Sequence, residues 1–149
     1  MYRHILVPTD GSKLSLKAAR AAAALAATVG AKITGLYVIE PFEPQWTGAL
    51  RALAPTPVSP REYQSYARKR AAAALETAGA HAAAAGVKFA SLVVEHRNPW
   101  QAIGKAAQSK KCDLIAMSSH GRRGLEGLLL GSQTSKVLTH SKVPVLVYR

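Results

Sequence analysis

Strand-like and helix-like segments alternate along this chain of 149 residues, and this alternation restricts the possible folds more than any other feature. Apolar runs typical of strands lie at residues 2–7, 32–39, 88–95, 113–117 and 143–148. Helical spacing marks the segments between them, at 12–29, 60–85, 99–110 and 132–140. Because most of the runs are continuously apolar, they are typical of strands covered on both faces. We predict an α/β fold, with an open, parallel, five-stranded sheet and helices on both faces.

The same pattern predicts one domain over residues 1–149, with one long irregular connection inside it. Ser12 or Ser15 caps the first helix and Gly30 ends it. Asn98 and Pro99 are a helix cap and a first helical residue. Residues 40–60, between the strand at 32–39 and the helix at 60–85, contain five prolines and no clear periodicity. Connections of this length are often functional or mobile.

Composition excludes some classes of protein and leaves others open. The formal charge is +12, which would suit a nucleic acid, an anionic lipid or a phosphorylated small molecule. Along the chain, however, the cations are scattered, as is usual for cations on solvated faces. No helix-turn-helix or aromatic stacking motif accompanies them. The single cysteine, Cys112, excludes an internal disulfide framework. No apolar run is long enough to cross a bilayer, and we expect a cytoplasmic protein that does not act at membranes.

Two loops carry the residues that suggest a ligand. The first strand ends at "PTDGS", and the fourth ends at "MSSHGRRGLEGLLLGS". Ligands of parallel sheets bind beyond the carboxyl ends of the strands, where the strand order reverses. If the order reverses between the first and fourth strands, both loops border one crevice.

The start of the last helix has the properties of an anion site. Its first N–H groups lack partners within the helix, Gly131 permits close approach, and Ser132 and Thr134 add hydroxyl groups. The alternative is that Gly131 and Ser132 only form a turn and a cap. A P-loop is excluded because Ser132 and Gln133, and no lysine, follow Gly131. The first loop also lacks the glycines of a dinucleotide-binding fingerprint.

Together with the ending "KVPVLVYR", these two loops resemble the universal stress protein family over essentially the whole chain. Its ATP-binding subgroup carries G-x2-G-x9-G-[ST]. Gly121, Gly131 and Ser132 match this spacing, and Ser118 stands where the motif has its first glycine. The resemblance implies a Rossmann-like fold of the adenine nucleotide alpha hydrolase type. The implied ligand is ATP or AMP, with or without Mg²⁺.

The resemblance also implies roles for individual residues. Pro8, Thr9 and Asp10 would lie beside the nucleoside, and Val38 would pack against the adenine. Met117 and Ser118 would border the ribose and the first phosphate. The phosphates would be held by Gly121, Gly131, Ser132, Gln133 and Thr134. Each position has a simpler interpretation: Asp10 can form an Asx turn, and Val38 and Met117 can be core residues at strand ends.

His120 and Arg122 are further candidates in the second loop. A histidine in a loop can act as a general base, but it more often makes a local hydrogen bond, and no partner for it is visible. Arg122 and its neighbour Arg123 could close over a triphosphate or remain solvated. No catalytic residue and no metal site are therefore predicted.

Three functions compete at this stage. The first is a stress-response or regulatory protein that binds ATP or AMP with little or no turnover, at most a slow ATPase or a self-phosphorylating protein. The second is a nucleotide-free interaction module of the same fold, whose site has decayed at Ser118. The third is a nucleic-acid binder, which only the charge supports.

The final strand predicts a homodimer. Its apolar residues are Val143, Val145, Leu146, Val147 and Tyr148, and the expected strand order places it at the edge of the sheet. A bare apolar edge exposes unpaired backbone groups. Antiparallel pairing with a second copy would satisfy those groups, and the family resemblance implies the same arrangement.

Overall fold

The strands form one parallel sheet in the order β3-β2-β1-β4-β5. The structure, a computed structural model, describes residues 1–42, 59–121 and 130–149. The strands are β1 (His4–Pro8), β2 (Lys32–Ile39), β3 (Phe89–Glu95), β4 (Leu114–Ser118) and β5 (Val145–Tyr148). The helices are α1 (Lys13–Val29), α2 (Pro60–Ala84), α3 (Pro99–Ser109) and α4 (Ser132–His140). The predicted α/β class is confirmed, and the strand order reverses between β1 and β4.

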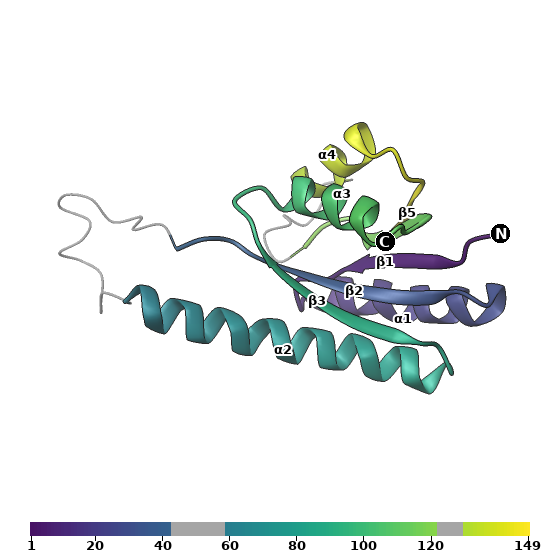
Figure 1. Cartoon of the computed structure of the whole chain (residues 1–149), viewed down its shortest axis with the longest axis horizontal. Coiled ribbons are helices and arrows are strands. Elements are labelled where there is room, and N and C mark those ends of the chain that lie inside the picture. Colours follow the sequence, from purple (N-terminus) through teal and green to yellow (C-terminus); the bar gives the residue numbers. More distant parts are fainter. Residues whose placement is uncertain (43–58, 122–129) are drawn as a thin grey trace.

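Helices cover both faces of the sheet. α1 and α2 lie on one face, and α3 and α4 lie on the other (Figure 1). The layer beneath α1 and α2 is rich in small side chains: Ala19, Ala22, Ala23 and Ala26 pack on Ile5 and Ile33. The layer beneath α3 and α4 contains Leu6, Leu36, Ile103, Ile115 and Met117. Both layers exclude apolar surface from water, which is the main stabilising contribution to a fold of this size.

The helix limits follow the capping signals closely. Ser12 caps α1 by accepting a hydrogen bond from Ser15 N at 3.2 Å, and Gly30 ends the helix in the left-handed region at φ 70°. Ser59 and Glu62 form a capping box at the start of α2. Gly131 is the N-cap of α4, so the cap is one residue earlier than the alternative interpretation placed it.

Two strands begin two residues later than predicted, and β3 and β4 each begin one residue later. β1 begins at His4 and not at Tyr2, because the Asp113 carboxylate accepts hydrogen bonds from Arg3 N at 2.8 Å and His4 N at 2.9 Å. β5 begins at Val145 and not at Val143. Val143 instead lies in a turn, where its N–H donates to the Ser141 hydroxyl at 3.0 Å.

Most of the proline-rich connection at 40–60 lies outside the described residues, which leave out 43–58. No helix in the part of the chain that the structure describes has the length and apolarity needed to cross a membrane.

Candidate functional site

A cavity of about 340 Å³ lies beyond the carboxyl ends of the strands, where the strand order reverses. Its volume is near the lower limit of typical small-molecule sites. Both loops that the sequence singled out border it. The predicted site residues that line it are Pro8, Thr9, Asp10, Val38, Met117, Ser118, His120, Gly121, Gly131, Ser132, Gln133 and Thr134. Arg122 lies outside the described residues, as does Arg123.

One wall of the cavity is apolar and comes from three elements. Leu36 and Val38 project from β2, Met117 comes from β4, and Ile103 comes from α3. Alternate residues of a strand point to the same face, so Glu40 continues the series of Leu36 and Val38 beyond the end of β2. This wall could pack against a flat aromatic group.

The loop after β1 is held by its own hydrogen bonds. The Thr9 and Ser15 hydroxyl groups lie 2.9 Å apart, and Gly11 N donates to Thr9 Oγ1 at 3.2 Å. Asp10 Oδ1 accepts a hydrogen bond from Ser12 N at 3.0 Å, which is an Asx turn. The simpler interpretation of Asp10 therefore describes one of its carboxylate oxygens.

The other oxygen of Asp10 brings the two loops together. A Cβ atom on Gly121 would overlap Asp10 Oδ2, so the backbone of the second loop approaches the carboxylate as closely as glycine allows. With any larger residue at 121, the Asp10 carboxylate or the loop would have to shift. Gly121 thus lets the loop after β4 lie against the Asp10 side chain of the loop after β1.

The loop after β4 is fixed at both of its described ends. Ser119 N donates to Tyr148 O at 2.7 Å, and Gly131 N donates to Ser119 O at 2.7 Å. The Thr134 hydroxyl donates to Ser118 O at 3.0 Å. These bonds place the first turn of α4 directly against the end of β4.

Ser118 is a buried strand residue whose side chain has a local role. Its hydroxyl donates to His120 O at 2.9 Å. Among the described residues other than glycine, only Lys111 has a positive φ, so the φ of Ser118 is not positive. The backbone at this position therefore does not require the glycine that the motif has. His120 Nδ1 lies 3.2 Å from the Ser119 hydroxyl, in agreement with a local hydrogen-bonding role.

The first turn of α4 presents backbone N–H groups at the cavity. Gly131 caps the helix without a side-chain hydrogen bond, and a Cβ on it would lie 3.1 Å from His120 Cα. A side chain at position 131 would therefore press on His120, beside the start of the helix. A helix N-terminus carries about half a positive charge and binds anions through its N–H groups.

Gln133 makes a hydrogen bond to a neighbouring helix that the sequence did not indicate. Its Oε1 accepts a hydrogen bond from Trp100 N at 3.1 Å, in the first turn of α3. Asn98 caps α3 without a side-chain bond, so Gln133 caps that helix from α4. The side chain thus joins the two helices whose first turns border the cavity.

Five further lining residues were not predicted from the sequence: Ser15, Leu36, Glu40, Pro99 and Ile103. The period of two along β2 could have indicated Leu36 and Glu40, because each lies two residues from Val38. Pro99 and Ile103 depend on how α3 packs, and no local signal indicates that. Among the lining residues that the structure describes, carboxylates are present at Asp10 and Glu40 but lysine and arginine are not.

Neither a metal centre nor a reactive thiol is visible in the described segments. No three His, Cys, Asp or Glu side chains gather there in a way that could hold a metal ion. Burial raises the pKa of the Cys112 thiol to about 11, so the thiol remains protonated near neutral pH.

This arrangement defines a doubly wound α/β domain with a cavity at the reversal of strand order. The model of the universal stress protein family matches residues 1–149, and the chain belongs to this family. A universal stress protein of Thermus aquaticus is 32% identical over 150 residues, which cover 100% of both chains.

Two solved structures show the same fold. MJ0577 of Methanocaldococcus jannaschii superposes with a TM-score of 0.79 at 28% identity, covering 99% of this chain and 95% of that one. A universal stress protein crystallised in complex with cAMP gives a TM-score of 0.72 at 29% identity, covering 99% of this chain and 97% of that one.

Proposed function

We propose that the cavity binds an adenine nucleotide, ATP or AMP, and that the protein is a stress-response or regulatory nucleotide binder. The observation that carries the proposal is the convergence of three features on one cavity. These are the apolar wall at Val38 and Met117, the meeting of Asp10 with Gly121, and the open first turn of α4 after Gly131. The similar protein that was crystallised with cAMP supports an adenine-containing ligand.

Each part of a nucleotide has a matching part of the cavity. The base would pack on Val38 and Leu36, and the ribose would lie between Asp10 and Met117. The phosphates would meet the N–H groups at the start of α4, with Ser132 adding its hydroxyl. Mg²⁺ bound to the phosphates would offset the negative charge of Asp10 and Glu40.

We expect little or no turnover. Asp10 Oδ1 accepts from Ser12 N, and the Thr9 and Ser15 hydroxyl groups contact each other. Efficient catalysis needs a base within hydrogen-bond reach of the group from which it takes a proton. The described lining offers His120, which contacts Ser119, and the carboxylates of Asp10 and Glu40, but no catalytic pair of a base and a nucleophile is seen among the contacts given above. Any hydrolysis or self-phosphorylation should therefore be far slower than the roughly ten turnovers per second of an ordinary enzyme.

Native mass spectrometry of freshly purified protein tests the proposal. A mass increment equal to ATP or AMP, lost on denaturation, is the expected result. Nucleotide-free protein that also fails to bind added ATP or AMP would contradict the proposal. It would favour the second function, an interaction module whose side chain at Ser118 has replaced the glycine of the motif.

We also propose a homodimer that forms through β5, the last strand on its side of the sheet. Ile115 N donates to Pro144 O and Ser119 N donates to Tyr148 O, so the backbone N–H and C=O groups of the even-numbered residues of β5 point toward β4. By alternation, the backbone groups of Val145 and Val147 point to the outer edge. Antiparallel pairing across a two-fold axis would satisfy them.

Side-chain exposure at β5 suits this arrangement in part. Leu146 is 37% exposed, whereas Val143 and Val145 pack on the layer beneath α3 and α4, and Tyr148 packs on the layer beneath α1. Leu146 would therefore supply apolar contact across the two-fold axis. Val147 would contribute mainly its outward N–H and C=O groups.

A further inference from the structure

Cations lead into every strand of the sheet. In the order of the strands across the sheet they are Lys88 before β3, Lys32 at the start of β2, Arg3 before β1, Lys110 and Lys111 before β4, and Lys142 before β5. All six are exposed. We call these six residues the amino-edge row. Along the sequence they are scattered, but the parallel strands bring them to one edge of the sheet, and the strand order sets which of them are neighbours.

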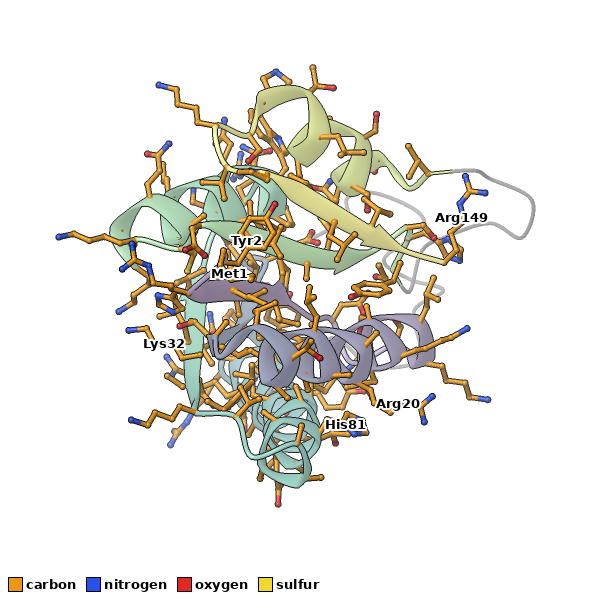
Figure 2. The ribbon with its side chains drawn as sticks, turned by 90° about the vertical axis from the view of Figure 1, so that its right-hand side faces the viewer. Met1, Tyr2, Arg20, Lys32, His81 and Arg149 are labelled. Carbon is orange, nitrogen blue, oxygen red and sulfur yellow. The ribbon has the colours of Figure 1, made fainter. Side chains whose placement is uncertain are left out.

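The backbone contacts place these residues side by side. Lys32 N donates to Arg3 O at 3.1 Å, Ile33 N donates to Lys88 O at 2.8 Å, and Asp113 N donates to His4 O at 2.9 Å. Neighbouring strands lie about 4.8 Å apart, so five strands spread the row over about 19 Å. Figure 2 shows Lys32 at the margin where the strands begin, with further nitrogen-tipped side chains around it.

Little negative charge opposes the row. In the segments that lead into the strands, the acidic residue is Asp113, and its two oxygens accept the N–H groups of Arg3 and His4. Burial is the main cause of the lowered pKa of His4, and the nearby charge of Lys32 lowers this pKa further. This edge of the sheet therefore carries a positive potential.

Helix C-termini explain part of this charge but not all of it. α1, α2, α3 and α4 all end at this edge, and each C-terminus carries about half a negative charge. Together they offset about two positive charges. The row with Asp113 has a net charge well above that, so an excess remains that the fold itself does not need.

We infer that the amino-edge row binds the phosphate backbone of duplex DNA. The row is a single file, which matches a linear polyanion better than the broad surface of a membrane. Duplex DNA carries about one negative charge per 1.7 Å of its axis, so 19 Å of it offers more phosphates than the row has cations. Single strands are usually held by several stacked aromatic side chains, whereas a single exposed tyrosine, Tyr2, adjoins the described row beside Arg3.

This binding would be independent of base sequence and of the nucleotide cavity. Contacts to phosphates position a protein on DNA but do not read its bases. The cavity lies at the carboxyl ends of the strands and the row lies at their amino ends, so both ligands could bind together. The inference thus goes beyond the proposed function and does not depend on it.

Fluorescence anisotropy with a labelled 20-base-pair duplex tests the inference. For four or five phosphate contacts, the logarithm of the binding constant should fall with the logarithm of the salt concentration with a slope of about −4. In a variant with Lys32→Gln, Lys88→Gln and Lys110→Gln, the slope should be smaller by about 2.7. Its affinity should be at least about tenfold lower near 0.1 M salt.

The matched control removes three cations from the exposed face of α1, with Lys13→Gln, Lys17→Gln and Arg20→Gln. Both triple variants lose the same net charge, and all six positions are exposed, so melting curves should match the wild type. The control should bind the duplex within about threefold of the wild type. Equal weakening of both variants would show a mere effect of net charge and overturn the inference. The inference would also be overturned if the wild type did not bind the duplex. The same holds if the row were needed for binding to phosphatidylserine vesicles and not for binding to DNA.

Discussion

His4 connects the pH of the solution to the stability of this fold. Its Nε2 lies 2.8 Å from the Thr34 hydroxyl, next to the end of β1 that Asp113 holds. Burial is the main cause of its lowered pKa, and the Lys32 charge adds to it. The unfolded chain therefore takes up a proton at His4 near the ordinary pKa of 6.5, while the folded chain still resists protonation.

The free energy of unfolding should accordingly fall as the pH drops below 6.5, until the pKa of His4 in the folded protein is reached. Urea unfolding at about pH 7.5, 6.5 and 5.5 measures this. A His4→Gln variant keeps a hydrogen-bonding group but cannot titrate, so it should lose less stability over the same range. The other histidines are common to both proteins. Identical pH profiles would therefore contradict the role of His4.

Asp113 should add a second loss of stability at lower pH. Although partial burial acts to raise its pKa, the hydrogen bonds from His4 N and Arg3 N lower it below the ordinary value of 3.8. A lowered carboxyl pKa stabilises the folded state above that value, and the contribution disappears as the pH falls through the pKa of the folded protein. Both residues thus make the protein less stable in acid.

At the scale of the elements, two helix ends adopt the same backbone conformation with different residues. Gly30 ends α1 at φ 70°, and Lys111 follows α3 at φ 54°. Around Lys111, Cys112 N donates to Ala107 O at 2.8 Å, which is a bond typical of a left-handed helix terminus. A side chain in this region is strained by about 1–2 kcal/mol, whereas glycine is not.

Exchanging the residue types should therefore change stability in opposite directions. Gly30→Ala should lower the free energy of unfolding by about 1 kcal/mol. A Cβ there would meet nothing within 4 Å, so a clash does not contribute. Lys111→Gly should raise it by up to about 1 kcal/mol. Denaturant titration of both variants gives the measurement, and a loss of stability in both would show that φ is not the cause.

Helix limits were more predictable from the sequence than strand limits. Caps such as Ser12 and Asn98 and the terminator Gly30 act within a few residues, so local patterns reveal them. The start of a strand depends on a distant partner, as Asp113 shows for His4. The Pro99 and Ile103 parts of the cavity depend in the same way on the packing of α3.

Most of the predicted site residues belong to the two loop motifs, whose residues are close together in the sequence. Gly121 and Gly131 could be found by spacing, but the reason for Gly121, its contact with Asp10, is tertiary. Ser118 looked like a damaged glycine, and its backbone proves to be ordinary strand. A cation at each strand start can be read along the chain, but which members of the amino-edge row are neighbours follows only from the strand order.

At the scale of the whole molecule, the sheet has two outer strands, β3 and β5. Ile33 N donates to Lys88 O and His96 N donates to Ile39 O, so Val93 points its backbone N–H away from β2. Val147 does the same on β5. Val93→Pro and Val147→Pro thus each remove one outward donor, from opposite edges of the sheet.

Light scattering after gel filtration of these two variants tests the dimer. The wild type should be dimeric at micromolar concentration, Val93→Pro should remain dimeric, and Val147→Pro should shift toward monomer. Leu146→Pro is less suitable, since the Leu146 N–H faces β4 and its loss would disturb the sheet itself. A monomeric wild type would refute the dimer, and a dimeric, folded Val147→Pro variant would place the interface elsewhere.

Calorimetric titration with ATP measures whether the cavity between the loops after β1 and β4 binds an adenine nucleotide. Gly131→Val would add branched atoms at the start of α4, where even a single added Cβ would lie 3.1 Å from His120 Cα. Gly104→Val is the matched control, because a Cβ there meets nothing within 4 Å. The wild type and Gly104→Val should bind ATP alike, and a folded Gly131→Val should show no measurable binding. Unchanged affinity in a folded Gly131→Val variant would contradict the account.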